Sequence, residues 1–442
     1  MTDYFRKRLA RLLSIIPVSE AVKDKVRFYY RRSVFLLSKI FAKRQTNMAD
    51  LKQNYIRQIL AIPELPRSPQ YVPYDENKSS FQREPQDAKL IAYYLTQFHP
   101  TPYNDLWWGR GVTEWNNVTR AVPQYLGHLQ PRLAGELGYY DLRLEQVMQR
   151  QIELAREYGI YGFAYYYYWF DGKKLLAGPL ENFLKNKQMK MPFMLCWANE
   201  SWSKRFWGSN SGILIEQPAT EKSYQSFIFS VLEYFADERY IKLNGKPVLV
   251  IYKPSNIPNC AKVLDYWRQI CQQEGGWDIH IVGVREYDHS ALNLLALGFD
   301  AQTEFQPSST YAYSKQITGS MPLIQPKFGG RIISYEDLVV NKKYCLDPCK
   351  NTYRAIMPMW DNTARRNNEG LIYHGATPEL YKRWLIDILN DTYANRTPED
   401  SFVFINAWNE WGEGAYLEPD AFHGYAYLQA TKDALLTTRS SH

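Results

Sequence analysis

Apolar positions divide the chain at about residue 86, where short apolar runs begin to alternate with helical patterns. Eight of these runs are almost continuously apolar or aromatic, which is typical of parallel strands that are covered on both faces. The expected strands are residues 89–95, 162–167, 192–197, 247–252, 280–284, 300–305, 355–360 and 402–407. The pattern therefore predicts a sheet of many short strands that is shielded from solvent.

Amphipathic helical patterns lie between several of the expected strands. The clearest windows are residues 141–159, with Asp141 as the expected N-cap, 224–235 and 263–270. Another helix is expected to open at Thr377-Pro378, because proline at the first helical position follows a capping threonine. Eight strands that alternate with helices over about 350 residues predict a (β/α)8 barrel. A doubly wound open sheet is the alternative, although no glycine-rich phosphate turn follows the first strand.

The N-terminal region differs in charge from the rest of the chain. Residues 1–50 contain 12 Lys+Arg and 4 Asp+Glu, a net charge of +8, whereas the whole chain carries +7. Apolar residues recur at helical spacing within this arm, which predicts a basic amphipathic helix on an anionic membrane surface. A solvated helix that packs on the main domain is the alternative.

Residues 62–86 contain five prolines and are expected to form an extended linker. The expected domains are therefore a helical arm (1–61), a linker (62–86) and a catalytic barrel (87–442). No stretch has the length and apolar content of a spanning helix, and the N-terminus lacks the pattern of an ordinary signal peptide. We therefore expect a cytoplasmic protein that lies peripherally at the inner membrane face.

Composition adds an excess of aromatic residues: 13 Trp, 35 Tyr and 20 Phe make up 15% of the chain. Such an excess indicates either an aromatic core or a surface that stacks on sugars or bases. Nucleic acid is not an expected partner, because the positive charge is confined to the arm. Five scattered cysteines favour neither a disulfide framework nor a zinc site. No metal and no cofactor is expected.

In a (β/α)8 barrel the active site forms where the strands end, and these positions are rich in acids, amides and tryptophans. Aromatic rings stack on the C–H faces of sugars while carboxylates and amides bind their hydroxyls, so the combination predicts a sugar-binding groove. The candidate substrate-binding residues are Trp107, Trp108, Glu114, Trp115, Asn116, Tyr167, Trp169, Trp197, Asn199, Glu200, Trp202, Asp361, Arg365, Trp408, Asn409 and Trp411. For Glu114 and Asn116, hydrogen bonds that stabilise their own loop are the alternative.

The strongest local motif is WNEWGEG at residues 408–414, directly after the last expected strand. Breaking or forming a glycosidic bond requires two carboxyl groups at one anomeric carbon, one of which donates a proton. A pocket lined by tryptophan raises the pKa of a carboxyl group, so that one of the two can stay protonated near neutral pH. Glu410 and Glu413 are therefore the candidate catalytic residues.

The chain from about residue 89 to residue 427 resembles the WbsX-like proteins, a family related to glycoside hydrolase family 99. The resemblance depends on AYYLTQFHP at residues 92–100, WWGRGVTEW at 107–115, GIYGF at 159–163, WANE at 197–200 and WNEWGEG at 408–414. It implies a (β/α)8 barrel with a site that needs no metal. The hydrolases of the related family cleave α-mannosidic bonds with retention of configuration, and the resemblance implies similar chemistry here.

By this resemblance Glu410 assists the sugar's own 2-hydroxyl group as the nucleophile, through a 1,2-anhydro intermediate. Glu413 is then the general acid and afterwards the general base. The hydrolases have histidine where this chain has Gly412, a difference that changes the space between the two acids. WbsX-like proteins are generally assigned to the synthesis of bacterial surface polysaccharide, such as O-antigen or capsule, often as glycosyltransferases.

The favoured interpretation is a glycosyltransferase of lipopolysaccharide or capsule synthesis that uses a sugar donor and an oligosaccharide or lipid-linked acceptor. A retaining glycoside hydrolase or transglycosidase of the endo-α-mannosidase kind is the first alternative, and a non-catalytic sugar-binding protein is the second. The chain has no Asp-x-Asp metal motif, so a transferase would hold donor phosphate with arginine. The candidates are Arg110, Arg205, Arg285 and Arg365, for each of which a structural ion pair is the alternative.

Overall fold

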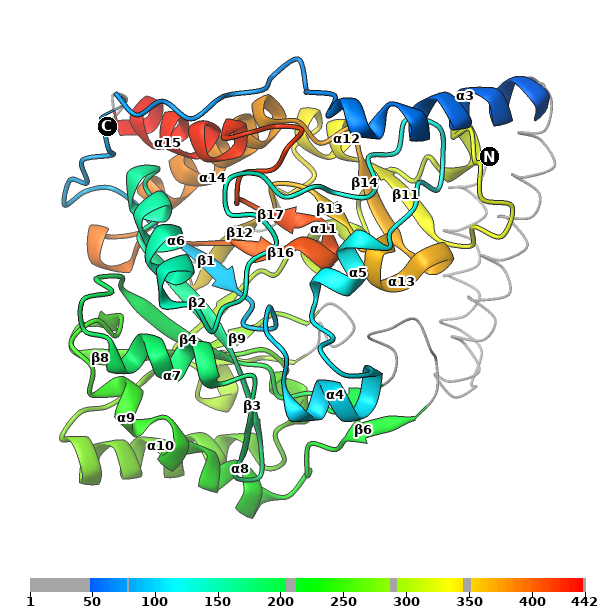
Figure 1. The fold of residues 1–442 in the computed structure, drawn as a ribbon. Helices are drawn as coiled ribbons and strands as arrows, with labels where there is room; N and C mark the ends of the chain where they lie inside the picture. The colour runs from blue at the N-terminus through cyan, green and yellow to red at the C-terminus, as the bar shows by residue number, and fades with distance from the viewer. Residues whose placement is uncertain (1–47, 78, 204–211, 287–291, 345–350, 440–442) are drawn as a thin grey trace, which may run out of the picture.

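The computed structural model describes residues 48–77, 79–203, 212–286, 292–344 and 351–439. Its centre is a closed barrel of parallel strands surrounded by helices (Figure 1). In order around the ring the strands are β1 (Lys89–Tyr94), β2 (Gly162–Phe170), β4 (Phe193–Trp197), β8 (Lys246–Ile251), β9 (His280–Val284), β10 (Ala301–Thr303), β12 (Thr352–Ile356) and β15 (Phe402–Ile405). Strand β1 pairs with both β15 and β2, which closes the ring. The predicted (β/α)8 barrel is confirmed, and the open-sheet alternative is wrong.

Every barrel strand overlaps one of the eight expected runs, because each run is apolar enough to be covered on both faces. Strand β9 has the expected bounds, and all residues of β4 are buried. Strand β12 begins at Thr352 rather than at residue 355, because it includes the charged Arg354 that broke the apolar pattern. Ion pairs of 2.8 Å to Glu304 and 2.7 Å to Asp391 allow this arginine to lie in the strand.

Helices cover the outside of the barrel and occupy the connections at its strand ends (Figure 1). They are α3 (Met48–Leu60), α4 (Pro102–Trp108), α5 (Trp115–Thr119), α6 (Glu145–Glu157), α7 (Gly178–Lys185), α8 (Glu221–Phe227), α9 (Leu232–Phe235), α10 (Cys260–Gly275), α11 (Ser308–Tyr311), α12 (Tyr335–Val340), α13 (Thr363–Arg366), α14 (Pro378–Asn395) and α15 (Ala426–Arg439). Thr377 caps α14 as predicted, because its hydroxyl accepts the backbone N–H of Leu380 at 3.2 Å.

Two helix predictions were wrong in detail. Asp141 lies outside α6, whose N-cap is Leu144, because the Asp141 carboxylate instead accepts hydrogen bonds from the backbone and side chain of Arg143. The window 224–235 is not one helix, since a 3-10 turn at Ile228–Ser230 separates α8 from α9. The apolar face stays buried through this break, so the periodicity persists while the hydrogen bonding changes.

Short strands outside the barrel add structure beside the ends of the barrel strands. They are β3 (Lys173–Leu175), β5 (Trp202–Ser203), β6 (Ile213–Ile215), β7 (Lys242–Leu243), β11 (Arg331–Ser334), β13 (Trp360–Asp361), β14 (Leu371–His374), β16 (Asn409–Glu410) and β17 (Ala415–Tyr416). Strands β11, β14 and β13 form a small sheet, and β16 pairs with β17. These strands lie in the connections that follow β10, β12 and β15, where a barrel of this kind places its active site.

Residues 1–47, which form most of the expected basic arm, lie outside the described residues. Helix α3 is the described end of that arm. Its Gln58 side chain donates to the carbonyl oxygen of His128 and accepts the N–H of Gly127, both at 2.9 Å. Residues 62–77 and 79–86 run along the side of the barrel that carries α15 (Figure 1), and Phe81 is buried there. Within the part of the chain that the structure describes, none of the helices combines the length and hydrophobicity of a membrane-spanning segment.

Candidate active site

The motif of residues 408–414 turns back sharply after β15. Glu410 ends β16, and Glu413 ends a single 3-10 turn, Trp411–Glu413, before β17 pairs back with β16. Gly414 is left-handed, with φ 56°, and a Cβ atom on it would lie 2.9 Å from the backbone oxygen of Asp361. Glycine therefore lets the turn close against the connection that follows β12.

One arginine joins three carboxylates at this turn. Arg365, on α13, contacts Glu114 Oε1 through Nε at 2.7 Å. Its Nη2 lies 2.6 Å from Glu410 Oε2, and its Nη1 lies 2.8 Å from Glu413 Oε1. The Arg365 side chain is only 8% exposed, so these are short charge-assisted contacts away from bulk water. Arg365 therefore corresponds to the ion-pair alternative rather than to an open phosphate site.

The two glutamates of the motif differ in their exposure to solvent. The side chain of Glu410 is 6% exposed, whereas that of Glu413 is 25% exposed. Burial raises the pKa of Glu413 to about 7; Arg365 opposes this rise, and the neighbouring Glu410 and Glu114 add to it. A carboxyl group with this pKa gives up and takes back a proton near neutral pH, as a general acid and base must.

Glu114 completes the cluster from the long connection after β1. It is fully buried, and burial raises the pKa of its carboxyl group, an effect that Arg365 opposes. Gly412 makes room for it, because a Cβ atom there would overlap Glu114 Oε1 and lie 2.8 Å from Arg365 Nε. The space that a side chain at position 412 would fill is thus taken by the Glu114–Arg365 pair. Glu114 thus binds Arg365, which comes from a distant connection, rather than serving only its own loop.

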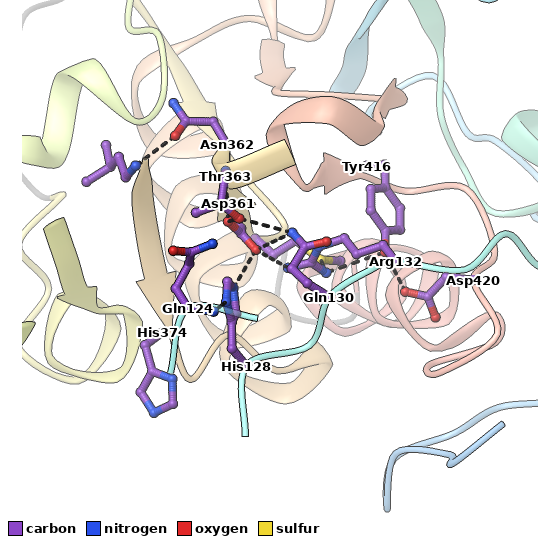
Figure 2. A network of polar contacts seen from close by, with 12 residues as sticks. Gln124, His128, Gln130, Arg132, Asp361, Asn362, Thr363, His374, Tyr416 and Asp420 are labelled. Atoms are coloured by element: carbon purple, nitrogen blue, oxygen red, sulfur yellow. Dashed lines mark hydrogen bonds and ion pairs between the residues drawn. The ribbon is translucent and has the colours of Figure 1, made fainter. Parts of the chain in front are cut away.

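Asp361 belongs to a second polar cluster, which Figure 2 shows around its carboxylate. Asp361 Oδ2 accepts hydrogen bonds from His128 Nε2 at 2.7 Å and Gln130 Nε2 at 2.6 Å. Asp361 Oδ1 accepts the Thr363 hydroxyl at 2.6 Å. Burial would raise the pKa of Asp361, but His128 and the nearby Arg132 hold it well below its usual range. Because both oxygens are satisfied inside the protein, the contacts of Asp361 favour a positioning role over direct contact with a sugar.

The candidate asparagines Asn409 and Asn199 make the same kind of hydrogen bonds, each to the backbone of a neighbouring strand end. Asn409 accepts the N–H of Leu95 at 2.8 Å and donates to the Leu95 carbonyl at 3.0 Å. Asn199 accepts the N–H of Lys253 and donates to the Lys253 carbonyl, both at 2.8 Å. Both side chains are fully buried, so each ties the end of its own strand to the end of the neighbouring strand.

Most of the candidate aromatic residues belong to the core. Trp197 is fully buried and stacks on Phe227 of α8, with ring centroids 3.7 Å apart. Tyr167 and Trp169 contact the same Phe227, between the barrel and its outer helices. The other buried members of the set are Trp115, Trp408 and Trp411. These residues therefore pack in an aromatic core, as the alternative interpretation of the aromatic excess expects.

The predicted sugar ligands on β2 therefore need a correction. Successive residues of a strand point to opposite faces, so Tyr167 and Trp169 face the helices while Tyr166 and Tyr168 face the barrel interior. Burial raises the pKa of both inward tyrosines, and the charge of Glu410 contributes to each rise. The alternation of side chains along residues 162–170 could have separated the inward from the outward residues. With four consecutive tyrosines, however, the residue types do not show which positions face inward.

A row of aromatic rings begins at Tyr168, which lies near Glu410, Arg365 and Glu413. The Tyr168 ring lies 5.0 Å from that of Trp202, and Trp202 lies 6.1 Å from Trp107. All three rings are half-buried, as is the neighbouring Trp108. Two of the predicted sugar-stacking residues, Trp107 and Trp202, are thus brought together beside the catalytic candidates, with Tyr168 between them and the acids.

The remaining candidates differ in exposure and in the contacts they make. Asn116 is exposed and accepts the N–H of Thr113 at 2.8 Å, as a loop-stabilising residue does. Glu200 is half-buried, and its charge adds to the burial that raises the pKa of Tyr252. The other arginines considered for phosphate are Arg110, which is exposed, Arg285, which is half-buried, and Arg205, which lies outside the described residues.

The arrangement combines acids, one arginine and aromatic rings at the ends of the barrel strands. Such a set can protonate a leaving oxygen, accept a proton from an attacking hydroxyl, and stabilise positive charge at an anomeric carbon. Among the residues that the structure describes, no group of three or more His, Cys, Asp or Glu side chains is placed to hold a metal ion.

Comparison of the sequence with known families gives one match across most of the chain. Residues 90–431 match the family described as "Glycosyltransferase WbsX". The uncharacterized protein WxcX of Xanthomonas campestris pv. campestris is 40% identical over 348 residues, which are 79% of this chain and 50% of that protein. The protein of the same name from a second strain matches equally well. The chain thus spans about half the length of the curated relatives it matches.

Solved structures resemble the barrel at low sequence identity. A structure described as a glycoside hydrolase-like protein has a TM-score of 0.51 and 15% identity, and the match covers 82% of this chain and 97% of that one. The GH99 endo-alpha-mannosidase from Bacteroides thetaiotaomicron has a TM-score of 0.47 and 12% identity, with 81% and 99% coverage. The first likeness supports the barrel fold and carries no information on substrate.

Proposed function

The chain belongs to the WbsX glycosyltransferase family, and from that premise we propose that it is a carbohydrate-active enzyme that builds bacterial surface polysaccharide. One observation carries the proposal: Glu410 and Glu413 share the guanidinium of Arg365, and the pKa of Glu413 is raised to about 7 by burial. Two carboxyl groups of this kind at the strand ends of a barrel suit the making or breaking of a glycosidic bond.

We assign the two glutamates different roles. In the first half of the reaction Glu413 gives its proton to the leaving oxygen as the bond from that oxygen to the anomeric carbon breaks. The sugar's 2-oxygen forms a bond to the anomeric carbon and passes its own proton to Glu410. In the second half an acceptor hydroxyl attacks the anomeric carbon and passes its proton to Glu413, while the bond between the 2-oxygen and the anomeric carbon breaks and Glu410 returns its proton to the 2-oxygen. The configuration at the anomeric carbon is retained, since each half inverts it.

The aromatic row beside the acids is the proposed sugar-binding surface. Tyr168, Trp202 and Trp107 are half-buried and follow one another in a row that begins near the Arg365 cluster. Stacking on a sugar ring needs aromatic faces that water can still reach, which the fully buried Trp197 lacks. We therefore propose that this row, with Tyr166 beneath it, binds the saccharide next to the scissile or newly formed bond.

Hydrolysis or transglycosylation is the second candidate, and one observation favours it. Each of the three guanidinium nitrogens of Arg365 contacts a carboxylate, so this arginine does not serve a donor diphosphate. The chemistry of the two glutamates is the same for both candidates, and only the attacking group differs. A water molecule gives hydrolysis, whereas a saccharide hydroxyl gives transfer.

A donor screen with the purified protein separates these candidates. We expect nucleotide or saccharide leaving groups to be released only when an oligosaccharide or lipid-linked acceptor is present. Release of reducing sugar from oligosaccharides without any acceptor would instead indicate hydrolysis. If neither donor class turns over while sugars still bind, the protein is a binding module and the catalytic proposal fails.

We also propose that the protein works at the inner face of the cytoplasmic membrane. The support is the net charge of +8 on residues 1–50, with residues 1–61 as the arm, 62–86 as the linker and 87–442 as the catalytic barrel. Attraction to anionic lipid should amount to about 1 kcal/mol per basic residue near the surface and should weaken with salt. Flotation with anionic and neutral vesicles at low and high salt tests this. Equal recovery with neutral vesicles would contradict it.

A further inference from the structure

Helix α13 is too short to hold Arg365 in place by itself. It comprises only Thr363–Arg366, and its N-cap residue makes no side-chain capping hydrogen bond. The anchor comes instead from Asp361, whose Oδ1 accepts both the backbone N–H of Thr363 at 3.1 Å and its hydroxyl at 2.6 Å. Arg365, which binds three carboxylates, therefore lies on a single helical turn whose start is held by the buried Asp361.

The other oxygen of Asp361 is fixed by a loop that is far away in the sequence. His128 and Gln130 donate to Oδ2, and the Nδ1 atom of His128 accepts the backbone N–H of Gln124 at 3.0 Å (Figure 2). Because Nδ1 is an acceptor, Nε2 carries the proton that His128 donates to Asp361. Both ring nitrogens are thus engaged, and His128 acts as a rigid spacer between the loop and the aspartate.

Asp361 also touches the turn that carries Glu413. A Cβ atom on Gly414 would lie 2.9 Å from the Asp361 backbone oxygen and 3.0 Å from its Cβ. The aspartate therefore lies between α13, which carries Arg365, and the turn next to Glu413. A shift of Asp361 would move both α13 and the turn, and would thus change the distance between Arg365 and Glu413.

We propose that Asp361, held by His128 and Gln130, is a positioning residue that fixes Arg365 among Glu114, Glu410 and Glu413 and so sets the protonation of the catalytic acid. This inference rests on the proposed function, because it gives Glu413 the role of acid and base. The groups that face Glu413 are the charges of Arg365, Glu410 and Glu114 and the rings of Tyr168 and Tyr252. Arg365 is the cation in this set, so its displacement must favour the protonated form of Glu413.

The test measures the titration of Glu413 without any substrate. A carbodiimide with glycinamide labels protonated carboxyl groups, and Glu413 is exposed enough to react. The full-length protein is labelled over a series of pH values, and peptide mapping by mass spectrometry separates Glu413 from Glu410 and Glu418. In the wild type we expect the labelling of Glu413 to fall with a midpoint near pH 7.

Asp361→Asn is the main variant, and Asp237→Asn is its matched control. Asp237 is also buried and held by an arginine, Arg239, at 2.8 Å, but it lies by the start of β4, away from the strand ends that carry the site. We expect Asp361→Asn to move the Glu413 midpoint up by about one pH unit, a tenfold change in the ratio of its two forms. Asp237→Asn should lower the melting temperature without moving this midpoint.

A second pair of variants keeps the test decisive if Asp361→Asn does not fold. His128→Gln retains a donor for Asp361, whereas His128→Leu does not. We expect His128→Leu to raise the Glu413 midpoint and His128→Gln to return it toward the wild-type value. If Asp361→Asn and His128→Leu are less stable but titrate as the wild type does, Asp361 is only structural and the inference is wrong. The proposed function would survive that result, because it depends on turnover and not on this midpoint.

Discussion

Arg354 and Arg365 are both largely buried, and each binds more than one carboxylate. Arg354, on β12, lies 2.8 Å from Glu304 and 2.7 Å from Asp391 of α14, so it ties the barrel wall to an outer helix. Arg365 binds three glutamates at the ends of the strands. The first cluster has two acids for its cation, and the second has three.

Both clusters have more carboxylates than one guanidinium can neutralise, so the third acid and the exposure of Glu413 distinguish the reactive cluster from the structural one. Burial raises the pKa of Glu304, but Arg354 opposes the rise, and the carboxylate also accepts the N–H of Ala355 at 3.1 Å. Glu304 is 6% exposed, whereas Glu413 is 25% exposed and has a pKa raised to about 7. The additional carboxylate and the greater exposure of Glu413 leave this group able to exchange a proton with a ligand.

Replacing the exposed acid, Glu413, should have the largest effect. Glu413→Gln removes the exchangeable proton, so turnover should fall by about 10²–10⁴-fold, the usual share of general acid–base catalysis. Glu304→Gln is the matched control, and it should lower the melting temperature while turnover stays near the wild-type value. Steady-state rates and thermal melts of both variants check this. A similar loss of turnover in Glu304→Gln would remove the distinction between the clusters.

Exchanging each arginine for lysine comes next in size. Lysine cannot reach three carboxylates in the fixed geometry of a guanidinium group, so Arg365→Lys should displace the glutamates and cost about 10²-fold in turnover. It should also move the pH optimum upward, because Arg365 lowers the pKa of Glu413. Arg354→Lys should change only stability, as measured by chemical denaturation. An unchanged pH optimum in Arg365→Lys would count against the electrostatic account.

A methyl group at position 412 should break the Arg365 cluster by crowding. In Gly412→Ala the new Cβ atom overlaps Glu114 Oε1, so the free energy of unfolding should fall by about 1–3 kcal/mol. Adding Glu114→Ala should then cost less than it does in the wild type, because the displaced carboxylate no longer holds Arg365. A double-mutant cycle measured by denaturant unfolding tests this coupling. Strict additivity would show that the two positions do not compete for space.

The comparison also predicts a pH dependence of stability. The pKa of Glu413 is raised in the folded protein from an ordinary 4.5 to about 7, so the folded state holds this proton more tightly than the unfolded state does. The resulting stabilisation is complete below about pH 4.5 and is lost as the pH rises to about 7. The wild type should therefore lose stability relative to Glu413→Gln over this interval. A constant difference in melting temperature across it would contradict the raised pKa.

The barrel could be predicted from the sequence, and so could the position of Glu410 and Glu413 after its last strand, because both are local signals. Each strand is a short apolar run of its own, and Glu410 and Glu413 follow the last run within one motif. Trp107 and Trp202 could also be predicted as candidates, since both lie in connections that follow barrel strands. The sequence pattern was thus enough to predict features that lie within a single stretch of the chain.

The partners of these residues could not be predicted, because they come from distant parts of the chain. Arg365 meets Glu114 across 251 positions, and His128 meets Asp361 across 233. A strand end also has two faces, and Tyr167 and Trp169 were assigned to the wrong one. Sequence identifies groups that could bind sugar, but only the packed barrel shows which of them are already bound to protein.

The most direct test of the catalytic pair compares how Glu410→Gln and Glu413→Gln depend on the leaving group. Turnover of each variant is measured on one donor with a leaving group that needs protonation and on one with a leaving group that does not. We predict that the good leaving group largely rescues Glu413→Gln, which lacks only the proton donor, and does not rescue Glu410→Gln. Equal rescue of both variants, or near-normal turnover of both as folded proteins, would show that these glutamates do not form the catalytic pair.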